Sequence, residues 1–268
     1  MNDCRKSAIL ADMLRARLNE EQWQWLEQSA QKSGRMFHLA LAQCPRRLGK
    51  QDLQPGASEL AAAAKALPGW SASEWSVDQC ARVWLIAQLP EQGFLEAFTR
   101  LVHTGDVREH MAYFSGLPFY PAPKALVDLA ADGLRSNVSS VFCAIAQRNP
   151  FPAAHFPEHA WNQMILKAVF IGAELAHVVG VDARNNVTLA TMLHNYVRER
   201  RAANRSVPGE LWRCIIPCAP DELLEEILPA WQTATGLEKE GMARAFKQRG
   251  DTIAKSALAM PTTLLKSD

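Results

Sequence analysis

Short apolar segments with helical spacing alternate along the chain with short polar breaks. Trp23, Leu26 and Ala30 recur at helical intervals after Asn19-Glu20-Glu21, which is suited to start a helix. The later segments have ordinary helix lengths, and the breaks contain Pro, Gly, Asn or Asp. The pattern predicts further helices at about 35–44, 57–66, 76–88, 90–103, 106–115, 122–134, 137–148, 157–172, 187–204, 221–233 and 238–249.

Strand signals are almost absent, so we expect an all-α fold of many short antiparallel helices. Such a chain forms either a HEAT-like α-solenoid or an irregular helical bundle, and no clean sequence period decides between them. The polar segment 45–57, PRRLGKQDLQPGA, is the best internal linker because it carries Pro and Gly. We therefore predict an N-terminal helical lobe at 1–50 and a second helical domain at 51–268.

Composition describes an ordinary globular protein with a formal net charge of +1, so we expect no nucleic-acid partner. No stretch approaches 18 uninterrupted apolar residues, and we expect no membrane span. The first 21 residues are too charged for a secretory signal, and the expected location is cytoplasmic. The six cysteines show no framework spacing and are expected to be reduced thiols.

Standard catalytic signatures are missing from the sequence. There is no phosphate-binding glycine loop, no dinucleotide fingerprint and no nucleophile elbow. Nucleotide binding by a standard loop and hydrolysis by an elbow serine therefore lack support, and we predict no cofactor.

The run HFPEH at 155–159 matches a zinc pattern, H-x-x-E-H. Zinc would need both histidines one turn apart on one helix face. Pro157 fits best at the first position of a helix, where its missing N–H is no loss. A helix beginning at Pro157 leaves His155 outside it, so we predict no metal site.

The helix predicted at 157–172 is apolar nearly all round, which is typical of a buried helix. It nevertheless carries Asn162, Gln163 and Lys167, whose polar atoms need partners when buried. One interpretation is that these groups tie neighbouring helices together. The other is that they line a cleft and bind a polar metabolite.

The helix predicted at 187–204 follows Asn186, a plausible N-cap. Glu199 and Arg200 project from the margins of its apolar face, and charges facing a core need partners. We expect them to meet Lys167, Asn162 or a ligand. The opposite face, expected to be solvated, collects His194, Arg198, Arg201 and Arg205, and its role is left open.

Three stretches within roughly residues 105–213 are distinctive: YFSGLPFYPAPKALVDLAADGLRSNVSSVFCAIA, RNPFPAAHFPEHAWNQMILKAVFIG and GVDARNNVTLATMLHNYVRERRAANRSVPGELWR. Together they resemble the EboA family. The most distinctive part joins Asn-Pro-aromatic-Pro to Ala-Trp-Asn-Gln. Two positions depart from the family pattern Tyr-x-His-Glu-Arg-Trp-Ala-Ala, because Arg198 stands at the His position and Arg201 at the Trp position.

The resemblance implies a helical protein encoded in an ebo gene cluster, which makes or moves secondary metabolites towards the periplasm. It implies a cytoplasmic accessory protein whose partners are a small-molecule metabolite, other ebo-cluster proteins, or both.

Three functional hypotheses follow. The favoured one is a binding or scaffold protein that holds a pathway metabolite or enzyme through a helical cleft. The alternative is an enzyme of unassigned chemistry on a prenylated or cyclitol-like intermediate, with Lys167 or Glu199 as base or acid. A third is a metalloprotein using His155, Glu158, His159 or His194. The predicted ligand-binding residues are Arg135, Asn149, Asn162, Gln163, Lys167, Glu199 and Arg200.

Overall fold

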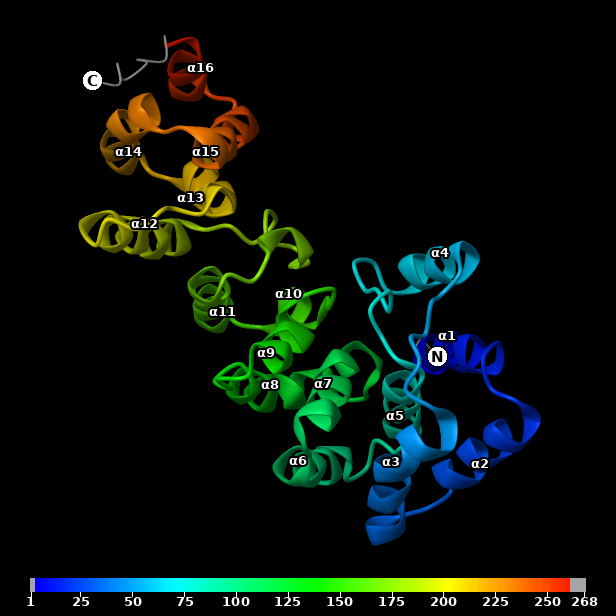
Figure 1. The fold of residues 1–268 in the computed structure, drawn as a ribbon. Helices are drawn as coiled ribbons and strands as arrows, with labels where there is room; N and C mark the ends of the chain where they lie inside the picture. The colour runs from blue at the N-terminus through cyan, green and yellow to red at the C-terminus, as the bar shows by residue number, and fades with distance from the viewer. Residues whose placement is uncertain (1–2, 261–268) are drawn as a thin grey trace. The chain divides into compact units, whose positions relative to one another are not determined.

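The computed structural model describes residues 3–260, and the side chains of residues 6–260. Within this range the chain forms sixteen α-helices, several short 3₁₀ helices and no strand. Figure 1 shows the helical ribbon. A single antiparallel bridge joins Asp52 to Ser76. The all-α prediction is confirmed.

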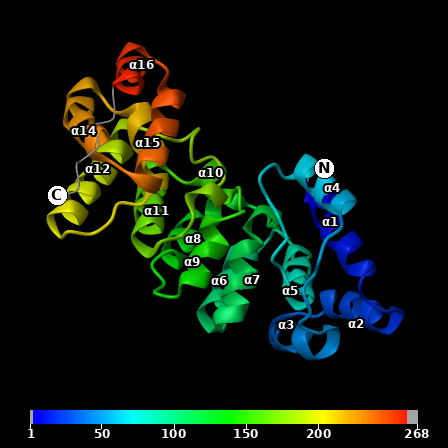
Figure 2. The ribbon, with the colours of Figure 1, turned by 45° about the horizontal axis from the view of Figure 1, so that its top comes forward.

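The helices fall into two compact units that divide between Pro157 and Glu158. The α-helices of the first unit are α1 (Asp3–Arg15), α2 (Glu20–Ala30), α3 (Gly34–Leu48), α4 (Ala57–Ala66), α5 (Val77–Ala87), α6 (Phe94–Thr104), α7 (Val107–Ser115), α8 (Val127–Gly133), α9 (Ser139–Ala146) and α10 (Phe151–His155). Those of the second are α11 (Glu158–Ile171), α12 (Val187–Ala202), α13 (Trp212–Ile215), α14 (Asp221–Thr233), α15 (Gly236–Arg249) and α16 (Thr252–Ala259). Both successions can be followed by colour in Figures 1 and 2.

The first unit is built around α5, nearly all of whose side chains are buried. Helices α1, α3 and α7 pack against it, and α7 in turn packs against α9. Helices α1, α2 and α3, from the segment expected to form a separate lobe, all contact α5 within a larger unit. The main division of the contacts falls after residue 157, whereas the sequence pattern suggested a boundary after residue 50.

The second unit is organised around α13 and α15. Helices α12 and α15 both pack against α13, and α16 packs against α15. Trp212 on α13 and Phe246 on α15 are fully buried at this centre.

Several helices begin close to the residues at which the sequence predicted a helix start. The Asn19 side chain closes a capping box at α2, and the Asn186 side chain accepts a 2.8 Å hydrogen bond from the Leu189 N–H at the start of α12. Helix α11 begins at Glu158, directly after Pro157, while His155 ends the separate helix α10. The two histidines of HFPEH therefore do not share a helix.

Two expectations are wrong. Pro45 does not open a linker but lies inside α3, which continues to Leu48. His194 is not on a solvated face: it is 5% exposed and lies 3.8 Å from the carboxylate of Glu226.

Within the described residues, none of the helices is both long and apolar enough to span a membrane.

Candidate functional site

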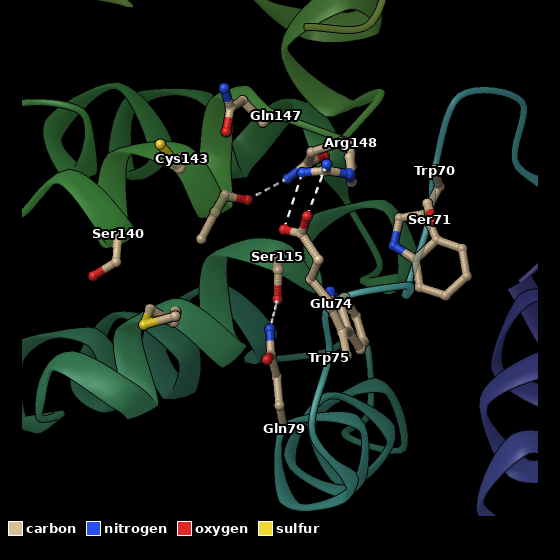
Figure 3. A pocket seen from close by; sticks show the side chains of 13 residues that line it. Trp70, Ser71, Glu74, Trp75, Gln79, Ser115, Ser140, Cys143, Gln147 and Arg148 are labelled. Carbon is tan, nitrogen blue, oxygen red and sulfur yellow. Dashed lines mark hydrogen bonds and ion pairs between the residues drawn. The ribbon is translucent and has the colours of Figure 1, made fainter. Parts of the chain in front are cut away.

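A cavity of about 210 Å³ lies inside the first unit and is shown in Figure 3. Its walls come from the segment before α5, from α5, α7 and α9, and from the turn after α9. We call it the Glu74–Arg148 cavity. Its lining residues are Trp70, Ser71, Glu74, Trp75, Gln79, Met111, Ser115, Ser140, Cys143, Ala144, Gln147, Arg148 and Asn149.

The charged lining residues neutralise each other. Two guanidinium nitrogens of Arg148 bind the two carboxylate oxygens of Glu74, at 3.0 and 2.8 Å, and Figure 3 shows this paired contact. The backbone of Arg148 has a φ of +50°, in the left-handed region that non-glycine residues seldom adopt. Its carbonyl accepts a hydrogen bond from the Ser71 N–H. Side chain and backbone of Arg148 thus both connect to the segment that carries Trp70 and Trp75.

Asn149 is the structural anchor of the cavity and is 2% exposed. Its amide nitrogen donates to the carbonyls of Phe114 and Ala144, and its amide oxygen accepts from the N–H of Phe151. These bonds join the end of α7, the last turn of α9 and the start of α10. The Asn-Pro-Phe-Pro run therefore fixes the turn that closes the cavity.

An aromatic cluster forms the wall opposite α9. The rings of Trp70 and Trp75 meet edge to face with centroids 5.1 Å apart, and Trp70 meets Phe119 at 4.9 Å. In Figure 3, Ser140 and Cys143 on α9 lie on the opposite side of the view from Trp70. The cavity thus has an aromatic side and a side of small polar groups.

Uncharged hydrogen-bonding groups complete the lining. The Gln79 side-chain amide nitrogen donates to the Ser115 hydroxyl at 3.0 Å, and Figure 3 shows the two side chains together in the cavity lining. Burial raises the pKa of the Cys143 thiol, while the nearby Arg148 lowers it. A raised pKa favours the neutral thiol, whereas a nucleophilic cysteine reacts as the thiolate.

The two predicted site residues of the first unit differ in position. Asn149 lines the cavity. Arg135 follows α8, has an 85% exposed side chain and forms an ion pair with Asp132 at 3.6 Å. It is not among the lining residues of the cavity.

The other five predicted residues lie in the second unit. Asn162 is buried, and its amide exchanges two hydrogen bonds with Asn186, of 3.1 and 2.9 Å. Gln163 is exposed and Lys167 is half-buried on the same helix, α11. Asn162 therefore ties α11 to the N-cap of α12.

Glu199 and Arg200 lie at the far end of α12 from that contact. Glu199 follows Asn186 by thirteen positions along the chain, or about 20 Å along the helix axis. Glu199 is exposed, and Arg200 donates to the Tyr196 hydroxyl at 3.0 Å. The structure brings Asn162 to Asn186, but does not bring Glu199 or Arg200 to Asn162.

Most of the lining could not be inferred from the pattern of residues. The available signal was Trp70 and Trp75 in the polar segment LPGWSASEW, because two large aromatic residues in a loop mark a segment that is buried. Ser140 and Cys143 carry no comparable signal. They reach the cavity through the packing of α9.

The described residues show no metal cluster, and the Cys214-x-x-x-Cys218 pair is not a disulfide. Across residues 6–260, no three His, Cys, Asp or Glu side chains are grouped so that they could hold a metal ion. Cys214 and Cys218 are free thiols, and burial raises the pKa of Cys214 to about 12. Cys214 lies in α13 and Cys218 ends the 3₁₀ helix Ile216–Cys218 that follows it.

Fold and cavity together define a class: an all-α protein with a small cavity whose lining residues include no standard catalytic constellation. A family model described as metabolite traffic protein EboA matches residues 6–216. Because that match covers most of the chain, the chain belongs to the EboA family. No curated protein and no solved structure matched it.

Proposed function

We propose that this protein is an accessory protein of a secondary-metabolite pathway that holds a compact, uncharged polar metabolite in the Glu74–Arg148 cavity. The observation that carries the proposal is the lining itself: an aromatic side, a side of small polar groups, and a charged pair that is already neutralised. Pockets that bind small molecules combine apolar walls with a few placed polar groups.

The size and charge of the cavity set the ligand class. At about 210 Å³ the cavity is smaller than the roughly 300–1,000 Å³ of drug-sized sites, so it suits a small molecule. A charged ligand would have to compete with the two-bond contact between Glu74 and Arg148. A neutral molecule with hydroxyl or amide groups can bond to the serine and glutamine side chains, and can place a flat apolar face against Trp70.

Native mass spectrometry of the protein, purified gently from its own host, tests this proposal. We expect an added mass of a few hundred daltons or less that is released on denaturation. A bare polypeptide mass would contradict metabolite binding and would favour a scaffold that contacts other ebo-cluster proteins. A metal-sized addition would favour the histidine residues instead.

Two α11 residues that the sequence predicted to bind the ligand, Gln163 and Lys167, serve as the comparison in this experiment. Gln163→Ala and Lys167→Ala change α11, in the second unit, and leave every lining residue of the Glu74–Arg148 cavity in place. We expect the added mass to persist in both variants. Its loss would place the metabolite on α11.

A further inference from the structure

A second cavity, of about 500 Å³, lies in the first unit between the start of α3, the turn before α6 and α6 itself. We call it the Phe37–Phe94 cavity. Its floor is apolar, made by Phe37, Phe94 and Leu101, all at most 3% exposed, with Leu89 and Ala97 beside them. The volume falls within the roughly 300–1,000 Å³ range typical of small-molecule sites.

Its ionisable lining residues are all basic. Arg35 and His38 come from the first turns of α3, Arg100 comes from α6, and the lining includes no aspartate or glutamate. Arg100 reaches the Glu96 carboxylate one turn earlier on its own helix, but both side chains are mostly exposed. An exposed pair of that kind is weak, so the guanidinium can turn to an acid in the cavity.

Two helix starts add to the positive potential. Ser33–Gly34 and Gly93–Phe94 both line the cavity, and the Ser33 side chain does not cap α3, whereas the Phe94 N–H at the start of α6 donates to the Glu91 carbonyl. The first N–H groups of a helix have no partner within it and favour an anion. Here they supplement an apolar floor and three basic side chains.

We propose that the Phe37–Phe94 cavity binds an amphipathic anion, a linear apolar chain with one acidic head group. The chain would lie on Phe37, Phe94 and Leu101, and the acid would face Arg35, His38 and Arg100. The Glu74–Arg148 cavity lacks this combination, because its charged lining residues neutralise each other.

Calorimetric titration of the full chain with decanoate tests the proposal, with 1-decanol as a neutral probe of matched chain length. We expect decanoate to bind at least about tenfold more tightly than decanol. The Arg35→Ala, Arg100→Ala double variant should lose about tenfold in decanoate affinity. Arg46→Ala, which changes an exposed α3 residue that does not line the cavity, should bind as the natural protein does.

A filling variant separates the cavity from the surface charge. Ala97→Leu adds volume to the lining at a half-buried position and should abolish decanoate binding while the far-ultraviolet circular dichroism stays unchanged. Equal binding of decanoate and decanol, or unchanged binding by Ala97→Leu, would overturn the proposal. So would co-sedimentation with phosphatidylglycerol vesicles without binding of monomeric decanoate, because that would indicate a membrane surface.

The two proposals can fail separately. A Ser140→Phe variant fills the Glu74–Arg148 cavity and should leave decanoate affinity unchanged. Loss of decanoate binding in that variant would show that the acid occupies the first cavity, and would overturn the assignment to the second.

Discussion

Arg82 illustrates how a single buried side chain connects two helices. Pro45 has no N–H, so the Leu41 carbonyl one turn earlier in α3 loses its helical partner. The Arg82 guanidinium, on α5, donates to that carbonyl at 3.1 Å and pairs with Asp78 on its own helix. Arg82 and Asp78 are at most 4% exposed. The proline and the arginine therefore act as a matched pair across α3 and α5.

Arg82→Met should be strongly destabilising, because it leaves the Asp78 carboxylate buried without its cation. We expect a loss of about 3–5 kcal/mol in the free energy of unfolding. Urea denaturation measures it, with the exposed Arg46→Met as control. The Asp78→Leu, Arg82→Met double variant should recover much of the loss. A double variant as unstable as the single one would contradict this account.

His194 should make stability depend on pH. Burial lowers the pKa of His194; Arg198 and Arg201 act in the same direction, and Glu226 opposes them. The unfolded state, with an ordinary pKa of about 6.5, therefore binds the proton more readily than the native state does. Stability should be complete above pH 6.5 and should fall as the pH drops through 6.5 towards the native pKa.

His194→Leu should flatten the pH dependence of the urea midpoint between pH 7 and 5. His103→Leu, at an exposed position on α6, is the matched control and should keep the dependence of the natural protein. An unchanged slope in His194→Leu would show that another group is responsible.

At the scale of elements, the short turn between α9 and α10 shapes the Glu74–Arg148 cavity. Asn149 holds α7, α9 and α10 together through three hydrogen bonds, and Arg148 next to it adopts a left-handed backbone. The sequence marked Asn149 as a polar residue of interest. The pattern could not show that its polar atoms are occupied by the fold, because the Phe114 carbonyl that it binds lies 35 residues earlier.

Asn149→Ala should destabilise the first unit, because it leaves two carbonyls and one N–H in a buried turn without their partner. Each unsatisfied buried group costs about 1–3 kcal/mol, so we expect a loss of at least about 2 kcal/mol. Chemical denaturation would measure it beside Asn137→Ala, at an exposed position. A change below about 0.5 kcal/mol would mean that the carboxamide serves a ligand and not the turn.

In the second unit, Gly241 lets α15 approach the 3₁₀ helix at Gly209–Leu211. A Cβ atom on Gly241 would lie 2.1 Å from the Gly209 carbonyl oxygen. Gly241→Ala should therefore destabilise the protein, although alanine is favoured by about 1 kcal/mol inside a helix. Thermal unfolding is the measurement, and Lys247→Ala on an exposed face of α15 is the control. Stabilisation by Gly241→Ala would contradict the close approach.

Over the whole molecule, the helical periodicity of the sequence predicted most of the helices and the all-α fold class. It missed α1, although Leu10, Met13 and Leu14 recur at helical spacing and are fully buried. It also missed the short helices α10, α13 and α16. The sequence pattern could not predict the Glu74–Arg148 cavity, because the segment at Ser71 meets Arg148 only through long-range packing.

The family match places both proposed sites inside the shared region. Residues 6–216 include every residue that lines either the Glu74–Arg148 cavity or the Phe37–Phe94 cavity. Helices α14, α15 and α16 follow the matched region. We therefore expect a change at the lining to affect the family's role with metabolites more than a change on α14 or α16 does.

The most direct test compares two neighbouring serines on α9. Ser140 lines the Glu74–Arg148 cavity, whereas Ser139 is exposed and does not. Native mass spectrometry of Ser140→Phe and Ser139→Phe, both purified from the natural host, should show the metabolite mass on Ser139→Phe alone. The same bound mass on both variants would contradict the claim that this cavity holds the metabolite.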